Sequence, residues 1–426
     1  MKRGFYTIMT AQFFSSLADN ALFVAAVELL RPIDPLGWQR AALVPMFALF
    51  YVVLAPFVGA FADAYPKGRV MFISNAIKVI GCMLMFSGGH PLLAYAVVGL
   101  GAAAYSPAKY GILTELLPPS QLVKANGWIE GLTIASIILG VVLGGLLVGP
   151  IVSPWLMGLH IPGVSSAAQA AIGSMVLVYA LAAWFNTRIP LTGVSLHPMP
   201  RNWLVLLRDF GRCNRVLWKD RLGQISLATT TLFWGVSGNL RYIVLAWAAA
   251  ALGYSTSQAS GLVGVVAIGT AAGAVAASIH MRLDKATRVM PLGVAMGLLV
   301  VLMNWIDQFW LAAPFLILLG AIGGFLVVPM NALLQHRGHM LMGAGRSIAV
   351  QNFNEQAAIL ALGLGYSLAT GAGLSAFAAI TAFGALVASI MWAIQRWHRH
   401  NQRVHGEELA VMLRLTRDPH ETRAHG

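Results

Sequence analysis

Apolar residues occur in long runs along this chain, and polar residues gather between the runs. A helix needs about 20 apolar residues to cross a bilayer. Runs of that length, bounded by glycine, proline or charge, recur twelve times. The pattern therefore predicts an all-α membrane protein with twelve transmembrane helices. The expected segments are residues 5–30, 42–62, 70–88, 91–114, 125–149, 167–187, 223–250, 258–280, 288–306, 309–334, 346–370 and 373–396.

The longest polar connection lies between the sixth and seventh segments and predicts the domain organisation. From Arg201 to Arg212, basic and apolar residues alternate at near-helical spacing. This spacing fits an amphipathic helix on the membrane surface as well as a plain basic linker. For the tail we expect an unstructured end, with a short amphipathic helix or a docking site as the alternative. The expected parts are a six-helix bundle over 1–187, a linker over 188–222, a second six-helix bundle over 223–397 and a tail over 398–426.

The charge composition supports a membrane protein and predicts its orientation. Only 10% of the residues are charged, whereas soluble domains carry about 25%. With the N-terminus inside, 23 of the 28 lysines and arginines fall in cytoplasmic stretches, and only Arg31 and Arg40 fall on the other side. Basic loops stay in the cytoplasm, so we expect both termini to be cytoplasmic. The net charge of +13 then needs no nucleic-acid partner.

A polar face on the first segment is the first candidate site. Charged groups at membrane depth are costly, so each is a functional candidate. The spacing of the five polar residues places them on one side of a helix. That side predicts either a cavity wall that meets a polar substrate or a hydrogen-bonded seam between helices, and the position of Asp19 near mid-depth favours the cavity. The five are Gln12, Ser15, Ser16, Asp19 and Asn20.

A second face, on segment seven, carries Thr230, Trp234, Ser237 and Arg241. Arg241 is the only arginine well inside a predicted helix, and its planar fork suits a phosphate or a carboxylate. A permanent ion pair with Asp19 is the alternative, and a pair that opens for an anionic head group combines both roles.

The remaining intramembrane charges lie toward the cytoplasmic side. Tyr105 and Lys109 flank a proline in segment four, where Lys109 either meets substrate or snorkels, and snorkelling is the preferred interpretation for Lys78 in segment three. Glu130 and Glu355 occupy equivalent places in segments five and eleven, and we favour a gate or structural network for them over a proton site. Small-residue stripes predict close helix packing, with a flexing hinge as the alternative: Gly140, Gly144 and Gly145 in segment five, and Gly261, Gly264, Gly269 and Gly273 in segment eight.

Other kinds of chemistry find no support in the sequence. The histidine pairs have no acidic or cysteine companions at ligand spacing, so we expect no metal. No phosphate-binding loop precedes a lysine, and no Ser/His/Asp nucleophile arrangement is discernible, so neither a cofactor nor catalytic residues are expected. The two cysteines, Cys82 and Cys213, imply no disulfide framework.

The two halves are weakly similar to each other. An amide and a carboxylate stand four residues apart in Asn126–Glu130 and again in Gln351–Glu355. A parallel six-helix repeat is the architecture of major facilitator transporters. The loop after segment two resembles the cytoplasmic motif of that superfamily, with Gly59, Asp63 and Gly68–Arg69, although Gly68 stands five residues after Asp63 where three is usual.

Segments one to eleven resemble the bacterial lysophospholipid transporter family over about residues 5–397. The most specific string is Ala-Tyr-Ser-Pro-Ala-Lys-Tyr-Gly at 104–111. An outer loop at 150–166 and the tail fall outside the resemblance. Further matching strings are Ala18–Leu22, Ala55–Gly59, Lys67–Met71, Leu122–Gly127, Leu232–Gly235, Val328–Gln335 and Ala349–Asn352.

The resemblance implies a major facilitator fold in the bacterial inner membrane. It implies transport of lysophosphatidylethanolamine and lysophosphatidylglycerol from the outer to the inner leaflet by alternating access. A cytoplasmic acyltransferase–acyl carrier protein synthetase would then reacylate them. Asp19, Asn20, Tyr105, Lys109, Trp234 and Arg241 are the expected substrate-binding residues, and Asp63, Arg69, Glu130 and Glu355 are the expected gating residues.

Two other functions remain open at this point. A cation-coupled exporter of amphiphilic drugs shares the fold and the acidic residues. A membrane-embedded acyltransferase requires a His-Asp pair at short spacing near the membrane surface, and the sequence offers none.

Overall fold

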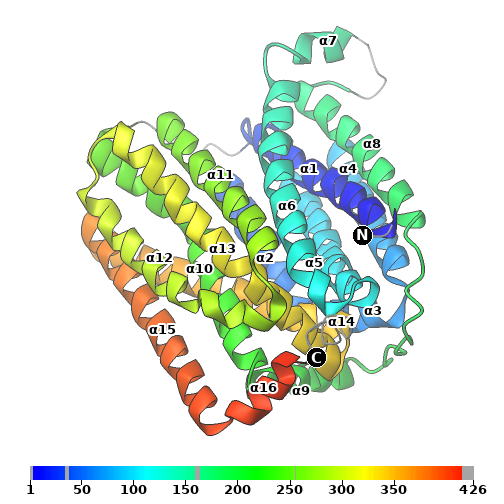
Figure 1. Ribbon diagram of the computed structural model, residues 1–426. Helices are drawn as coiled ribbons and strands as arrows, with labels where there is room; N and C mark the ends of the chain where they lie inside the picture. Colours follow the sequence, from blue (N-terminus) through cyan, green and yellow to red (C-terminus); the bar gives the residue numbers. More distant parts are fainter. Residues whose placement is uncertain (1–2, 34–37, 159–163, 255, 415–426) are drawn as a thin grey trace. The chain divides into compact units, whose positions relative to one another are not determined.

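The computed structural model describes residues 3–33, 38–158, 164–254 and 256–414. Within these ranges all regular structure is helical (Figure 1). Every one of the twelve predicted segments contains a helix, so the predicted all-α fold is confirmed. The helices are α1 (Arg3–Leu30), α2 (Trp38–Val53), α3 (Ala55–Ala64), α4 (Lys67–Phe86), α5 (Pro91–Leu116), α6 (Pro119–Val148), α8 (Ala167–Thr187), α10 (Gly223–Leu252), α11 (Thr256–His280), α12 (Met290–Leu302), α13 (Phe309–Met342), α14 (Ala344–Gly371) and α15 (Ala376–Val404).

Most of these helices are apolar enough to cross a bilayer. Within the described ranges, nine helices meet that condition by length and composition, and the bent pair α2–α3 makes a tenth. Helices α10 and α14 do not meet it. Their interiors carry polar side chains, among them Asn239 and Arg241 in α10 and Gln351 and Glu355 in α14. Both of these helices carry predicted site residues.

The predicted segment 42–62 is not one continuous helix. Helices α2 and α3 meet at Leu54 with a bend of 63°. Pro56 lies in the first turn of α3. Proline has no N–H to donate to the preceding turn, and its ring clashes with that turn, so the helix breaks just before it.

The predicted helix in the linker is present as α9 (Trp203–Lys219). Its apolar face, with Leu206, Cys213 and Leu217, is buried in protein. Burial and nearby Asp209 raise the pKa of the Cys213 thiol to about 11. The interpretation of α9 as a membrane-surface helix stays a prediction for its first turn, where Trp203 is exposed.

The expectation of an unstructured tail was wrong for its first part. Helix α15 continues to Val404, and a short helix, α16 (Gly406–Arg414), follows it with Leu409 buried. Apolar residues at helical spacing outweighed the general polarity of this stretch. The described part of the outer loop forms a short helix, α7 (Ser153–Gly158). Residues 159–163 of that loop and residues 415–426 of the tail lie outside the described ranges.

The helices group into two compact units. Unit 1 comprises residues 1–116, 132–213 and 342–352, and unit 2 comprises residues 117–131, 214–341 and 353–426. The division into bundles at 187 and 223 stays a prediction.

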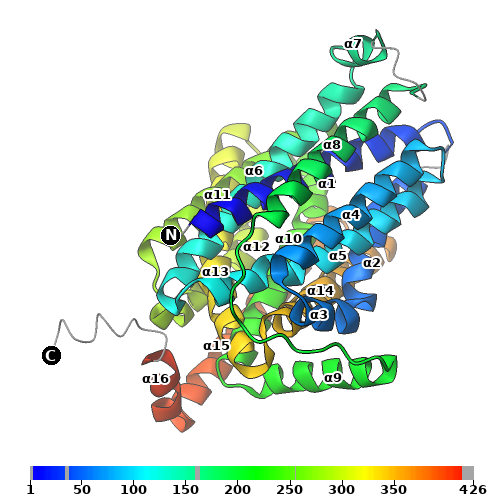
Figure 2. The same cartoon turned by 90° about the vertical axis from the view of Figure 1, so that its right-hand side faces the viewer.

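The core of unit 1 lies between α1, α4, α5 and α8. Figure 2 shows α4 beside α5, and α1 beside α8. Leu22, Met85, Val98, Ile172 and Tyr179 meet in this core, one or more from each helix, and each is at most 1% exposed. In unit 2, α12 packs along α15, as Figure 1 also shows.

Glycines allow some helix pairs to approach with their backbones almost in contact. In unit 2 a Cβ on Gly273 of α11 would lie 2.0 Å from the carbonyl oxygen of Ala321, and one on Gly324 of α13 would lie 2.1 Å from that of Thr270. In unit 1, a Cβ on Gly140 or Gly144 of α6 would lie 2.6 or 2.7 Å from a backbone carbonyl oxygen of α1. The packing prediction is confirmed for Gly140, Gly144, Gly269 and Gly273. It is wrong for Gly145, Gly261 and Gly264, around which the described residues leave open space.

The contrast within α11 gives a direct test. We expect Gly273→Ala to destabilise the protein by about 2 kcal/mol, because the new methyl group forces two tightly packed helices apart. Gly264→Ala adds the same methyl where nothing lies within 4 Å and should leave stability unchanged or slightly raised. Denaturant unfolding of the purified protein in detergent measures both. Equal effects would contradict this account of the packing.

Candidate functional site

The polar face predicted on α1 is present, and it forms bonds between helices of unit 1. The Gln12 amide donates to Thr133 Oγ1 of α6 over 3.3 Å, and Ser15 Oγ donates to Asn75 Oδ1 of α4 over 2.8 Å. Asn20 donates to the carbonyl oxygen of Ser16, one turn back in α1. Gln12, Ser15 and Asp19 therefore take part in a seam between helices, the interpretation that the sequence favoured less.

Asp19 is the centre of this seam. Lys78 Nζ of α4 lies 2.8 Å from each oxygen of the Asp19 carboxylate. The Tyr179 hydroxyl of α8 donates to Asp19 Oδ1 over 2.6 Å, and Lys78 also donates to Ser15 Oγ over 3.0 Å. Lys78 is 1% exposed, while 21% of the Asp19 side chain is exposed. The acid is thus held by a buried cation and a phenol and keeps one side open.

The snorkelling interpretation of Lys78 was wrong. Lys78 stands eleven residues after the start of α4, which at 1.5 Å per residue is about 16 Å along the helix. A lysine side chain cannot span that distance to reach the helix end, so its ammonium needs a partner inside the protein. The depth of Lys78 was the available signal. Tyr179 gave no signal, because a lone tyrosine in an apolar helix is common.

Tyr105 and Lys109, two other predicted residues of unit 1, both belong to α5, and Tyr105 lies near Lys78. Tyr105 of α5 is buried, and its ring centroid lies 5.1 Å from Lys78 Nζ. Lys109, one turn further along α5, is buried with its Nζ 4.1 Å from the centroid of the Tyr110 ring. Asp19, Tyr105 and Lys78 therefore form one cluster.

Four predicted residues belong to unit 2. Glu130 of α6 and Glu355 of α14 are both buried. Arg241 of α10 is exposed, and Trp234 on the same helix is half-buried. Near Glu130, the amides of Asn126 and Gln335 donate to each other over 2.9 Å in both directions. The substrate and gating roles of these residues stay predictions.

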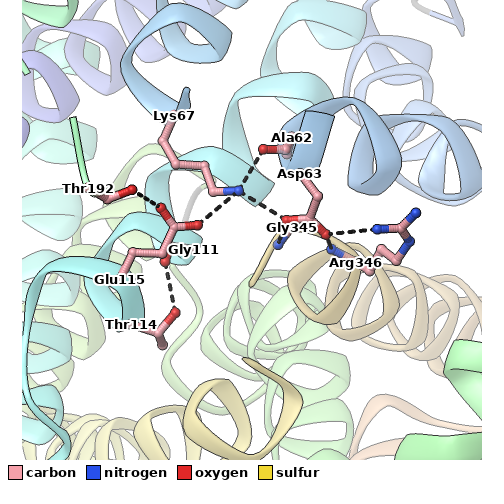
Figure 3. A network of polar contacts seen from close by, with 9 residues as sticks. All are labelled: Ala62, Asp63, Lys67, Gly111, Thr114, Glu115, Thr192, Gly345 and Arg346. Atoms are coloured by element: carbon pink, nitrogen blue, oxygen red, sulfur yellow. Dashed lines mark hydrogen bonds and ion pairs between the residues drawn. The ribbon is translucent and has the colours of Figure 1, made fainter. Parts of the chain in front are cut away.

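A second polar cluster surrounds Asp63 at the end of α3 (Figure 3). One carboxylate oxygen accepts from the backbone N–H of Gly345 over 2.6 Å, and the other accepts from that of Arg346 over 3.0 Å. These amides belong to the first turn of α14, where no intrahelical acceptor exists. A carboxylate placed there satisfies them and complements the helix dipole. The backbone of Gly343, with φ at +94°, lets the chain enter α14 close to Asp63.

Lys67, at the start of α4, connects Asp63 to a second carboxylate. Its Nζ lies 3.0 Å from Asp63 Oδ1 and 3.1 Å from Glu115 Oε1 (Figure 3). Glu115 also accepts from the Thr192 hydroxyl over 2.8 Å. All three charged side chains are nearly inaccessible, at 3–6% exposure.

Asp63 forms ion pairs with Lys67 and, over 3.5 Å, with Arg346, whereas Arg69 of the same motif is exposed. Sequence reasoning missed Lys67, Glu115 and Thr192. The spacing of four residues between Asp63 and Lys67 was a usable signal.

The described residues offer binding chemistry and no sign of metal chemistry. No group of three or more His, Cys, Asp or Glu side chains within the described ranges is placed to hold a metal ion. The two cysteines are free and buried. Unit 1 presents a carboxylate at Asp19 whose side chain is 21% exposed, which suits a cationic ligand group, and unit 2 presents an exposed guanidinium at Arg241, which suits an anionic one.

The Asp63 cluster gives a stability prediction. Asp63→Ala removes the cap of α14 and leaves Lys67 buried with one partner fewer, so we expect a loss of about 3 kcal/mol. Arg69→Ala, from the same motif but exposed, should change stability by less than about 0.5 kcal/mol. Denaturant unfolding in detergent compares them. A larger loss for Arg69→Ala would contradict the pairing with Lys67.

Comparison with known proteins agrees with this architecture. The family model of the Major Facilitator Superfamily matches residues 8–353. The chain is 40% identical over 399 residues to the Lysophospholipid transporter LplT of Enterobacter sp. (strain 638), covering 93% of this chain and 96% of that protein. It is 41% identical over 361 residues to the Lysophospholipid transporter LplT of Yersinia enterocolitica, covering 84% and 85%.

Solved structures share the fold at low sequence identity. The fucose transporter FucP in the outward conformation matches with a TM-score of 0.69 and 12% identity, over 92% of this chain and 98% of that chain. The human organic anion transporter MFSD10 matches with a TM-score of 0.67 and 16% identity, over 92% and 100%. The chain therefore belongs to the Major Facilitator Superfamily, and within it to the family of bacterial lysophospholipid transporters.

Proposed function

We propose that this protein moves lysophospholipids from the outer to the inner leaflet of the bacterial inner membrane by alternating access. The observation that carries the proposal is the 40% identity, over 93% of the chain, to a protein named as a lysophospholipid transporter. At that identity and coverage, the fold and most of the buried side chains are expected to be shared.

The chemistry of the candidate residues supports this substrate class. Lysophosphatidylethanolamine carries an ammonium and a phosphate. In our proposal, the guanidinium of Arg241 binds the phosphate through its fork, and the open side of Asp19 receives the ammonium. The ammonium then competes with Lys78, which already holds both carboxylate oxygens. Asn20, Tyr105, Lys109 and Trp234 contact the remainder of the substrate.

The gating residues complete the proposal. A transporter that alternates between two states needs contacts that form in one state and open in the other. We assign this role to Asp63, whose bonds to the start of α14 are polar and replaceable by water. Arg69, Glu130 and Glu355 are assigned to the same cytoplasmic network.

The orientation and the fate of the product are part of the same proposal. The excess of basic residues in the loops supports two cytoplasmic termini. The inner leaflet is then where a separate cytoplasmic acyltransferase–acyl carrier protein synthetase receives the lysolipid. The transporter itself catalyses no acyl transfer.

Reconstitution tests the proposal directly. Purified protein in liposomes should move labelled lysophosphatidylethanolamine from the outer to the inner leaflet faster than protein-free liposomes do. Resistance of the label to extraction by albumin measures the transfer. Proton-driven efflux of amphiphilic drugs without lysolipid transfer would favour the drug exporter instead.

The role of Arg241 gives a sharper prediction. We expect Arg241→Ala to abolish lysophospholipid transport with normal membrane insertion, and Arg241→Lys to restore little, because an ammonium lacks the fork. Tyr242→Phe alters the exposed neighbour on α10 and serves as the control with near-normal transport. The liposome assay and a membrane-fraction blot measure these outcomes. Normal transport by Arg241→Ala would exclude the head-group role.

A further inference from the structure

A pocket of about 320 Å³ lies in unit 1 at the start of α4. Lys67, Gly68 and Arg69 of α4 form one wall, and Asn186, from the end of α8, and Leu191, from the following linker, form another. Lys67 belongs to the Asp63 cluster and Arg69 is also assigned to the gating network, but none of these wall residues is assigned to substrate binding. Lys67 already forms ion pairs with Asp63 and Glu115. Arg69 is therefore the cation of this wall that can bind an added anion.

The first turn of α4 presents unused backbone donors to this pocket. The helix follows Pro66, and no side chain caps it. The amides of Arg69 and Val70 donate to the Pro66 carbonyl. Those of Lys67 and Gly68 have no acceptor among the residues that the structure describes. An uncapped helix start with free N–H groups and a positive dipole end is suited to an anion.

Asn186 is an independent sign of a missing ligand. It is 1% exposed, yet neither its Oδ1 nor its Nδ2 has a hydrogen-bond partner in the described part of the chain. Native proteins rarely bury an amide unsatisfied, and such a group needs an explanation. Asn186 lies against the start of α4, because a Cβ on Gly68 would be only 2.9 Å from the backbone carbonyl oxygen of Asn186. Asn186, Arg69 and the two residues that carry the free helix amides all line the same pocket.

The character of the wall limits the class of anion. The wall carries no carboxylate, and two of its members, Phe72 and Leu191, are apolar side chains that are 42% and 78% exposed. Helix α4 is a membrane span, so its first turn lies near the depth of lipid head groups. An anion with several acceptor oxygens suits donors that come from three directions.

We propose that this pocket binds a phosphate group, supplied by the head group of a membrane phospholipid or by free phosphate. Arg69 and the amides of Lys67 and Gly68 hold the phosphate oxygens, and the amide of Asn186 completes the site. The site is separate from the transported substrate, so its existence does not depend on the proposed function.

Titration calorimetry of the full-length protein in an uncharged detergent tests the proposal. One arm uses dihexanoyl-phosphatidylglycerol and the other uses inorganic phosphate. We expect saturable binding in at least one arm, weakened about tenfold or more by Arg69→Gln, because a charge-assisted bond is lost. Arg188→Gln is the matched control. Arg188 is exposed, stacks on Trp184 and is not part of the pocket wall, so its loss should change affinity by less than about threefold.

Asn186→Leu separates a ligand role from a structural role. The amide makes no bond in the protein, so without phosphate this variant should unfold no more easily than the wild type. Its phosphate affinity should nevertheless fall several-fold. Binding in the lipid arm alone assigns the site to a head group, and binding in both arms assigns it to phosphate in general. The absence of binding in both arms, or binding that Arg69→Gln and Asn186→Leu leave unchanged, would overturn the proposal.

Discussion

A charge inside an apolar span has no water to solvate it, and the structure is organised around this constraint. Asp19 of α1 and Lys78 of α4 are 59 residues apart in the sequence, and each provides the opposite charge that the other needs inside the protein. The Tyr179 hydroxyl adds a third helix to the same point. This cluster therefore joins α1, α4 and α8 with polar bonds in the part of the chain where apolar packing alone gives little directional preference.

The same constraint applies to backbone groups at helix ends. Asp63 accepts hydrogen bonds from the first amides of α14, and Lys67 forms ion pairs with both Asp63 and Glu115. Arg346, 3.5 Å from Asp63, adds a second cation, so two carboxylates and two cations offset one another where each alone is expensive to bury. The Asn186 side chain and the first amides of α4 have no hydrogen-bond partner among the described residues, and we assigned them to a bound phosphate for that reason. Transport needs such polar contacts because they can be exchanged for contacts with water or substrate, whereas tightly interlocked glycine contacts such as Gly273 against Ala321 cannot.

The helices and several candidate residues could be predicted from the sequence. The length of an apolar run and a single charge within it are local properties that can be read without knowing how the helices pack. Asp19 was identifiable for that reason. Its partner was not, because the pairing with Lys78 depends on how α1 packs against α4; the sequence suggested Arg241 as an alternative ion-pair partner and favoured snorkelling for Lys78. The break at Pro56 was readable from one residue but was overlooked in a long apolar run. The pairing of Lys67 with Asp63 depends on where α4 begins, and helix boundaries are the least certain part of any sequence-based prediction.

The pairing of Asp19 with Lys78 is the central structural claim, and a double-mutant cycle measures it most directly. Asp19→Asn, Lys78→Met and the double variant would be compared by denaturant unfolding in detergent. Each single change strands a buried charge, so the account predicts that the double variant is more stable than the sum of the single losses by about 1–3 kcal/mol. Strictly additive losses would contradict it.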